Sequence, residues 1–349
     1  MTDSGPVVRA IDLFCGVGGL SHGLRRAGIE VAGGFDIDPR CEYPFKANIR
    51  APFFLQDVRT VTGAQLHDLW GQADVRLLAG CAPCQPFSSY RRGADTTGDE
   101  NWPLLDEFAR LIEETEPEVV TMENVPRVVG STVFQRFAKS LESLEYDVSF
   151  KSCHSAEYGL PQYRRRLVLI ASRIGRIEVP KGTRSEDKFV TVRKTIEKLP
   201  KLEAGEIDPD DSLHKSRNLS DLNLKRIRAS NPGGTWHDWP TSLRSPCHQR
   251  ATGSSFANVY ARMEWDKPSP TITTQAHNFG TGRFGHPEQD RSITLREAAM
   301  LQGFPRGYKF VPKGEPVEFV HIGRLIGNAV PPPLARAFGQ EIVKAATRR

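Results

Sequence analysis

The stretch VVRAIDLFCGVGGLSHGLRRAG, residues 7–28, combines three local patterns that together predict a fold. Residues 7–14 form an apolar strand pattern, residues 15–19 form a glycine-rich turn, and residues 20–28 have helical spacing. A strand, a glycine turn and a helix open a nucleotide-binding α/β sheet, because glycine lets the backbone approach a ligand. Ser21 stands where a dinucleotide fingerprint needs its third glycine, which disfavours a pyrophosphate clamp. The alternative that these glycines only form a tight turn stays open at this point.

Composition bounds the class of protein. The chain has 349 residues, of which 38% are hydrophobic and 26% charged, enough for two globular domains. No apolar run approaches the ~20 residues of a membrane helix, and the N-terminus lacks the pattern of a signal peptide. Six cysteines show no disulfide framework. We therefore expect a cytoplasmic protein with free thiols and no membrane association.

Acidic residues follow two further predicted strands. Residues 29–35 end at Asp36, about 20 residues beyond the glycine turn, and residues 53–55 lead to Asp57. A carboxylate at the end of the second strand suits ribose hydroxyls. For Asp57, capping of the next helical turn is an equally good explanation. Together with the glycine turn, these acids predict a site for an adenosine-containing cofactor without a diphosphate.

The fourth predicted strand, residues 75–79, ends in GCAPCQPFS, residues 80–88. Its prolines prevent the strand from continuing, so Cys84 is presented on a rigid loop at the sheet edge and is a candidate nucleophile. The spacing of Cys81 and Cys84 also fits a redox pair or half a zinc site. Zinc would need about two more nearby ligands, which the sequence lacks, so we expect no metal. Cys81 is then expected to be a small buried neighbour.

Glu123 ends the fifth predicted strand, residues 118–122, which follows a predicted amphipathic helix over residues 102–116. An acid after an apolar run is partly desolvated, which favours the protonated form that general acid catalysis needs. The alternative is a helix-capping or surface acid. The proline at 126 blocks continuation of the chain and favours the catalytic interpretation.

Six motifs, in order, resemble those of the DNA cytosine-5 methyltransferases. They are DLFCGVGG at 12–19, GCAPCQPFS at 80–88, ENV at 123–125, YGLPQYRRR at 158–166, LREAAMLQGFP at 295–305 and IGNAVP at 326–331. The motifs extend over most of the chain. The resemblance implies an α/β fold with a Rossmann-like S-adenosylmethionine-dependent methyltransferase domain and a smaller, loop-rich target recognition domain. It also implies base flipping, because an enzyme that modifies a base must take it out of the stack.

The resemblance also implies roles for individual residues. The catalytic residues would be Cys84, Glu123, Arg164 and Arg166. S-adenosylmethionine, the implied cofactor, would contact Phe14, Gly16, Gly18, Gly19, Asp36, Ile37, Asp57, Val58 and Asn328. The DNA substrate would contact Pro83, Gln85, Ser88, Asn124, Thr271 and Thr273. This sequence departs from the family pattern at Asp36 and Ile37, where a glutamate followed by an aromatic residue is common.

Arginines 164–166 have separate expected roles. Arg166 matches the motif arginine expected near the carbonyl oxygen of the base, and Arg164 is expected to hold the catalytic loop or backbone. Arg165 is expected to lie on a solvated face or to contact phosphate.

The predicted domains are residues 1–180 plus 322–349 for catalysis and cofactor binding, and 181–321 for target recognition. The strand and helix patterns fade after about residue 181, and residues 212–262 contain eight Lys or Arg against Asp221 and Asp238, net +6. A basic insert of this kind suits DNA binding. Arg244, Gln249, Arg250 and Asn258 are candidates for base readout. The aromatic residues Trp236, Trp239, Phe256 and Tyr260 are expected to form a small core.

The predicted function is transfer of a methyl group to carbon 5 of a flipped cytosine in a specific double-stranded DNA sequence, through a covalent Cys84 adduct. Two alternatives within the family are a tRNA cytosine-5 methyltransferase and a catalytically inactive DNA-binding paralogue. Outside the family, a C-x-x-C oxidoreductase would require a redox-active disulfide between Cys81 and Cys84. We expect a monomer of a restriction-modification system, with a cognate restriction endonuclease that shares its site.

Overall fold

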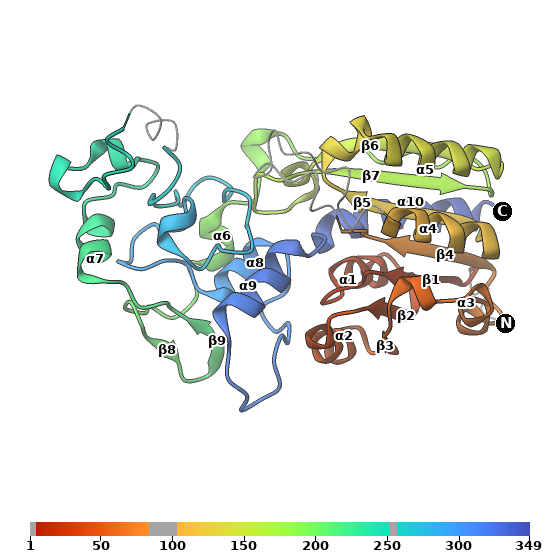
Figure 1. Cartoon of the computed structure of the whole chain (residues 1–349), viewed down its shortest axis with the longest axis horizontal. Helices are drawn as coiled ribbons and strands as arrows, with labels where there is room; N and C mark the ends of the chain where they lie inside the picture. The colour runs from red at the N-terminus through yellow and green to blue at the C-terminus, as the bar shows by residue number, and fades with distance from the viewer. Residues whose placement is uncertain (1–4, 84–102, 251–256) are drawn as a thin grey trace. The chain divides into compact units, whose positions relative to one another are not determined.

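The computed structural model describes residues 5–83, 103–250 and 257–349, and the chain divides into two compact units (Figure 1). Unit 1 consists of Met1–Tyr158, Arg165–Thr183 and Ala329–Arg349. Unit 2 consists of Gly159–Arg164 and Arg184–Asn328. The predicted catalytic domain began its last segment at residue 322, whereas the second unit extends to Asn328. The functional assignment of the two domains stays a prediction.

Unit 1 is built on a mixed sheet with seven strands among the described residues, in the order β3-β2-β1-β4-β5-β7-β6. The strands are β1 Val8–Leu13, β2 Glu30–Asp36, β3 Phe53–Leu55, β4 Val75–Gly80, β5 Val119–Asn124, β6 Asp147–His154 and β7 Arg165–Ser172. The first five strands pair in parallel, and β7 pairs antiparallel with both β5 and β6. The strand order reverses direction between β1 and β4, the place where open α/β sheets bind ligands.

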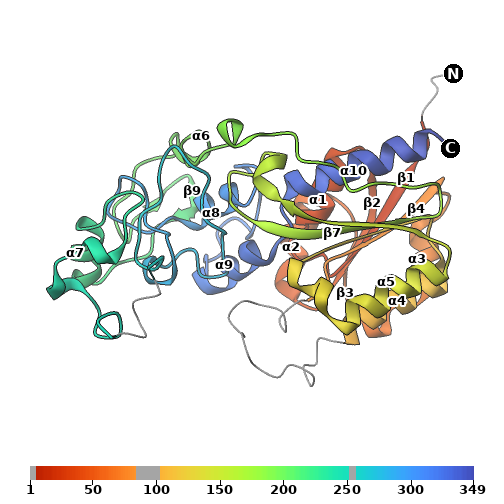
Figure 2. The same cartoon turned by 90° about the horizontal axis from the view of Figure 1, so that it is seen from above.

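Helices cover both faces of this sheet (Figure 2). Those of unit 1 are α1 Gly19–Arg26, α2 Glu42–Ile49, α3 Gly63–Trp70, α4 Pro103–Thr115, α5 Thr132–Ser143 and α10 Pro332–Thr347. Side chains alternate along each strand, so Ile11 and Leu78 pack under α3, α4 and α5, whereas Ala10 and Leu77 pack under α1 and α10. Both faces are therefore apolar, which explains why these strands are hydrophobic runs in the sequence.

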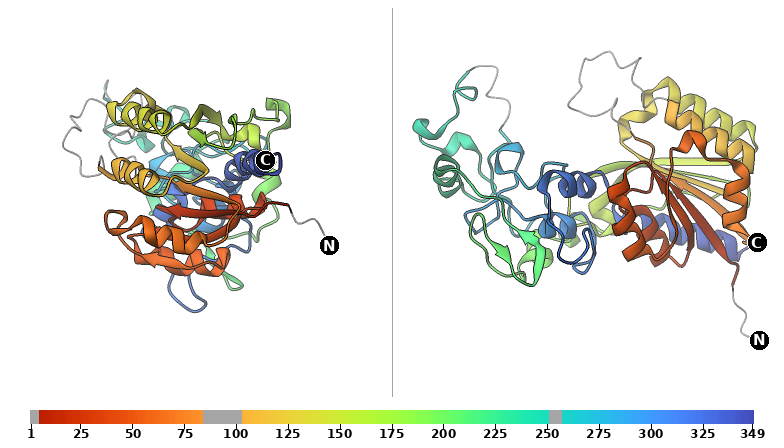
Figure 3. Two further views of the ribbon diagram at one scale, coloured as in Figure 1. Left: turned by 90° about the vertical axis from the view of Figure 1, so that its right-hand side faces the viewer. Right: turned by 60° about the horizontal axis from the view of Figure 1, so that its bottom comes forward.

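The C-terminal helix α10 returns to unit 1 and packs against α1 (Figure 3). Gly23 of α1 allows this close contact, since a Cβ atom there would lie 2.3 Å from the Cβ of Ala335. Near the end of the chain, Arg349 Nη1 donates to the carbonyl oxygen of Asp74, at 3.3 Å. The predicted helix over residues 331–347 and its return to the first domain are confirmed.

Unit 2 contains short elements joined by long loops. They are α6 Val192–Ile196, β8 Ile207–Asp208, β9 Asp211–Lys215, α7 Asp221–Arg228, α8 Leu295–Leu301 and α9 Phe319–Asn328. A small apolar cluster of Ile227, Trp236, Trp239 and Phe279, with Tyr260 against it, confirms the predicted aromatic core. Phe256 lies outside the described residues.

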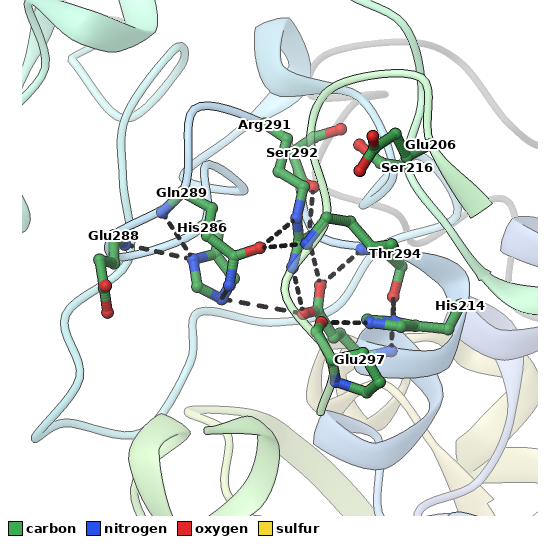
Figure 4. A network of polar contacts seen from close by, with 12 residues as sticks. Glu206, His214, Ser216, His286, Glu288, Gln289, Arg291, Ser292, Thr294 and Glu297 are labelled. Atoms are coloured by element: carbon green, nitrogen blue, oxygen red, sulfur yellow. Dashed lines mark hydrogen bonds and ion pairs between the residues drawn. The ribbon is translucent and has the colours of Figure 1, made fainter. Parts of the chain in front are cut away.

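A buried polar network surrounds the start of α8 in unit 2 (Figure 4). Arg291 donates two hydrogen bonds to Glu297, both at 2.8 Å, and each side chain is at most 1% exposed. Thr294 and Glu297 form a capping box at the start of α8. His286 Nδ1 accepts from the backbone N–H groups of Glu288 and Gln289, and His214 pairs with Thr294. The network ties strand β9 and the segment 286–292 to one short helix.

Candidate active site

The glycine turn after β1 has an unusual backbone. Phe14 has φ of 58°, Gly16 of 52° and Gly18 of 85°, all in the left-handed region, and Gly18 caps α1, which begins at Gly19. A Cβ atom on Gly18 would lie 2.8 Å from Ile49 Cγ1. This position therefore requires glycine for both its φ angle and its close packing.

Asp36 connects this turn to the end of β2. Its Oδ2 accepts from Gly16 N at 2.8 Å and its Oδ1 from Asp38 N at 2.9 Å. Burial raises the pKa of Asp36 above its ordinary value. The neighbouring Ile37 is 68% exposed. The structure thus brings three of the predicted cofactor residues, Gly16, Asp36 and Ile37, to one edge of the sheet.

Asp57 caps the 3-10 turn Val58–Thr60. Its carboxylate accepts from Arg59 N at 3.0 Å and pairs with Arg59 Nη2 at 2.6 Å. The hydrogen bond from the Arg59 side chain lowers the pKa of Asp57. The capping alternative is thus present in the structure, and the predicted adenine contact stays a prediction. Val58 is buried in the core under α3 and α4.

A buried aspartate next to the glycine turn was absent from the sequence-based predictions. Asp12 is 1% exposed, and its Oδ2 accepts from Ser21 Oγ at 2.6 Å. Its Oδ1 has no hydrogen-bond partner among the described residues. Burial raises the pKa of Asp12 to about 7. The signal in the sequence was an acidic residue inside an otherwise apolar strand. Asp12 is the first residue of the motif at 12–19, but the resemblance to the family gave it no role.

The segment that leads from β4 toward Cys84 is anchored at two points. Cys81 N donates to the carbonyl oxygen of Leu13, at 3.3 Å, and Asn124 Nδ2 donates to that of Ala82, at 3.2 Å. Pro83 is the last described residue of the segment. The predicted site residues Cys84, Gln85 and Ser88 lie outside the described residues.

Glu123 near the end of β5 is 2% exposed, which confirms the predicted desolvation. Its Oε1 lies 3.1 Å from Arg166 Nε, and its Oε2 accepts from Cys81 Sγ at 3.2 Å. The Arg166 contact is an ion pair whose direction does not meet hydrogen-bond geometry, so Oε1 has no hydrogen-bond partner among the described residues. Cys81 was predicted to be a small buried neighbour; it is half-buried, and its thiol contacts the carboxyl group.

The three consecutive arginines have different surroundings, and the predicted roles of Arg165 and Arg166 stay predictions. Arg165 is exposed, whereas Arg166 on the same strand pairs with Glu123. Arg164 belongs to unit 2, is 2% exposed, and donates to the carbonyl oxygens of Ile272 and Gly327 at 3.1 and 3.0 Å. It therefore holds backbone, as expected.

The threonine motif meets the same part of unit 2. Thr271 Oγ1 donates to the carbonyl oxygen of Tyr163 at 2.6 Å, and Thr273 Oγ1 accepts from Gln275 N at 3.3 Å. Gln162 Oε1 accepts from Ile272 N at 2.9 Å. Asn328, a predicted cofactor residue, is exposed at the end of α9 and belongs to unit 2.

Much of the positive charge between residues 212 and 262 has internal partners. Arg226 is buried and donates to Leu243 O, Asn223 Oδ1 and Ser245 Oγ. Arg262 is buried and contacts four carbonyl oxygens as well as Asp290. Arg244, a candidate for base readout, donates to the carbonyl oxygens of His237 and Trp239. The net charge of this window therefore overstates the charge available to a nucleic acid.

A solved structure defines the class of this fold. A protein described as a DNA modification methyltransferase encoded within an Escherichia coli prophage aligns over 97% of this chain and 99% of its own, with a TM-score of 0.75 and 22% identity. The chain thus shares the mixed α/β, Rossmann-like fold of that structure, which confirms the predicted fold class.

The family model of the C-5 cytosine-specific DNA methylases matches residues 8–344. The chain is 48% identical to the Type II methylase M.HgiDII of Herpetosiphon aurantiacus, over 95% of this chain and 94% of that protein. It is 33% identical to the Type II methyltransferase M1.HphI of Haemophilus parahaemolyticus, over 97% of this chain and 87% of that protein. The chain belongs to the C-5 cytosine-specific DNA methylase family. It is a DNA (cytosine-5-)-methyltransferase, and S-adenosylmethionine is its methyl donor.

Proposed function

We propose that this enzyme methylates cytosine through a covalent adduct between Cys84 and carbon 6 of the ring. Carbon 5 of cytosine is a poor nucleophile until a thiolate has added at carbon 6. The carbon–sulfur bond forms as electron density moves toward carbon 5, and carbon 5 then takes the methyl group. Loss of the carbon 5 proton restores the double bond as the sulfur leaves.

The observation that carries this proposal is the burial of the Glu123 carboxyl group and the contacts of its two oxygens. Its carboxyl group is almost completely buried, Cys81 occupies Oε2, and Oε1 has no hydrogen-bond partner among the described residues. A buried acceptor without a donor is costly, so a ligand that supplies one is favoured. The exocyclic amine of cytosine is such a donor. Glu123 would also lie beside ring nitrogen 3, where charge develops during the reaction.

The residues at the glycine turn fit the methyl donor. The amino acid end of S-adenosylmethionine carries an ammonium group, and when bound the molecule supplies an electrophilic methyl group from its sulfonium. Asp12, with its unpartnered buried Oδ1, matches a cation, and Asp36 at the end of β2 matches ribose hydroxyls. Phe14, Gly16 and Gly18 would border the methionine end, Asp57 the adenine amine, and Asn328 the far wall.

Substrate contacts are proposed for both units. Pro83, Gln85, Ser88 and Asn124 would meet the flipped base, and Thr271 and Thr273 would meet DNA, with unit 2 as the reader of a specific duplex sequence. Arg166 would lie near the carbonyl oxygen of the base. Although several arginines of unit 2 are buried, others are exposed and could contact DNA, among them Arg250.

Trapping of the adduct tests the mechanism. Duplex DNA with fluorine at carbon 5 of the target cytosine cannot lose a proton there, so sulfur elimination is blocked and enzyme and DNA should remain covalently joined. Cys84→Ala should form no adduct and transfer no labelled methyl group, while it still binds DNA. Adduct formation by Cys84→Ala, or its absence in the unaltered enzyme under conditions of active transfer, would contradict the mechanism.

We further propose that the enzyme protects a specific DNA site within a restriction-modification system, acting as a monomer beside a cognate endonuclease. The 48% identity to a protein named as a Type II methylase supports this context. Methylation-sensitive sequencing of DNA from cells that express the chain should show one short motif methylated on cytosine. Methylation without sequence preference would contradict it.

A further inference from the structure

The carboxyl group of Glu123 is contacted by two side chains, each on a different oxygen. Arg166 lies on Oε1 and Cys81 on Oε2, at 3.1 and 3.2 Å. The side chain of Glu123 is 3% exposed and that of Arg166 is 17% exposed. Because both contacts form in a largely dry environment, the direction of the carboxyl plane depends on both partners.

The thiol of Cys81 is itself held in place by the backbone. Cys81 N donates to Leu13 O on β1, and the next carbonyl oxygen, of Ala82, accepts from Asn124 on β5. The thiol thus comes from a segment anchored on both neighbouring strands, one residue after the end of β4. Its contact with Glu123 joins residues 42 positions apart.

A thiol differs from other donors in strength. An S–H group is a weak donor, whereas hydrogen bonds from O–H and N–H groups to a carboxylate are much stronger. In a buried site even a weak bond to Oε2 is enough to select one orientation of the Glu123 carboxyl group, and a hydroxyl in the same place would serve the same purpose.

We propose that Cys81 is a positioning residue, whose thiol holds the Glu123 carboxyl group in the orientation needed for attack by Cys84. The proposal rests on the proposed role of Glu123 in adduct formation. It assigns Cys81 no contact with substrate, so its loss acts on the rate of the chemical step and leaves substrate affinity unchanged.

The test compares Cys81→Ala with Cys81→Ser. The rate of adduct formation on 5-fluorocytosine duplex DNA, and the kcat of methyl transfer, should fall about tenfold in Cys81→Ala, the size expected for one lost hydrogen bond. The Kd for DNA and the KM for S-adenosylmethionine should stay within about twofold. Cys81→Ser, which keeps a donor of similar size, should recover most of the rate.

A matched control is Thr121→Val on the same strand. Thr121 is buried and donates to Leu169 O at 3.0 Å, so its loss removes a buried hydroxyl without touching Glu123. It should lower the Tm and leave the adduct rate unchanged. The inference is overturned if Cys81→Ala keeps the full rate, or if Cys81→Ser is as slow as Cys81→Ala while both have the Tm of the unaltered enzyme. Failure of the unaltered enzyme to form an adduct would instead contradict the proposed mechanism.

Discussion

Units 1 and 2 use buried charge in opposite ways. In the described part of unit 1, the buried ionisable acids and bases are Asp12 and Glu123, and both lie at the sheet edge where the candidate site is built. Unit 2 buries ten such side chains among its described residues: Arg164, Asp208, His214, Arg226, Arg262, His277, His286, Arg291, Arg296 and Glu297. Most of these bind one another or loop carbonyl oxygens. Buried charge is therefore confined to the candidate site in the described part of unit 1, whereas in unit 2 it adds a polar network to the hydrophobic core.

The difference follows from the elements available. Unit 1 has long strands and helices whose apolar faces fill two continuous cores. Unit 2 has long loops, whose backbone carbonyl oxygens must be hydrogen-bonded when they are buried. Arginine, with five donors in a fixed plane, can satisfy several such oxygens at once, as Arg262 does.

The largest stability effect is expected in the network of Figure 4. Glu297→Gln would leave Arg291 buried without a counter-charge, so the free energy of unfolding should fall by about 3–5 kcal/mol. Urea denaturation followed by circular dichroism measures this. Glu197→Gln, which breaks an exposed pair with Arg193, is the control and should change it by about 0.5 kcal/mol or less. Equal effects would mean that the network is not what holds unit 2.

The matching change in unit 1 should affect activity instead. Glu123→Gln keeps the shape of the side chain but removes its acid, so kcat should fall about 100-fold or more. The Tm should move by only a few degrees, because the side chain remains paired with its neighbours. Methyl transfer with labelled donor and a thermal melt check both. A large loss of stability with little loss of kcat would reverse the roles assigned to the two units.

A lower pH should destabilise unit 2, and in unit 1 it should remove the free-energy cost of burying an ionised Asp12. Burial lowers the pKa of both His286 and His277 to about 4. Below pH 6.5 the unfolded chain binds protons that the folded imidazoles do not, so stability falls as the pH drops from 6.5 toward 4. Burial opposes ionisation of Glu297, but Arg291 outweighs it and lowers the pKa to about 2, which extends the loss from pH 4.5 toward 2.

Asp12 behaves in the opposite sense. Burial raises the pKa of Asp12 to about 7. Its contribution to the free energy of unfolding is therefore fully present below about pH 4 and is lost as the pH rises through 7. Hydrogen exchange at pH 5 and pH 7.5 should therefore show α8 less protected at the lower pH and β1 less protected at the higher pH. Asp12→Asn should abolish the second effect. A parallel response of the two elements would contradict the comparison.

The smallest effect is expected at exposed basic residues of unit 2. Arg250→Ala should weaken DNA binding a few-fold and reduce the salt slope by about 1, with no change in Tm. Arg262→Ala should instead lower the Tm, because it leaves loop carbonyl oxygens unsatisfied. Binding titrations at several salt concentrations separate the two. If Arg262→Ala changed only DNA affinity, its burial would have no structural role.

The sequence predicted unit 1 far better than unit 2. The range 53–55 was correct for β3, and residues 75–79 missed only the last residue of β4. Strand and helix periods are local signals, so they can be read without knowing the fold. In unit 2 the stabilising contacts join distant residues, such as Arg164 with Gly327, and no local period records them.

The sequence by itself determined the class of this protein, since six motifs in order give the family. The tertiary structure decided which charges are exposed. It buried Arg226 and Arg262 inside the window predicted to bind DNA, and it brought Cys81 to one oxygen of Glu123, while the other oxygen, paired with Arg166, accepts no hydrogen bond from the described residues. The physical reason is that desolvation and pairing depend on neighbours in space, whereas composition and spacing count only neighbours along the chain.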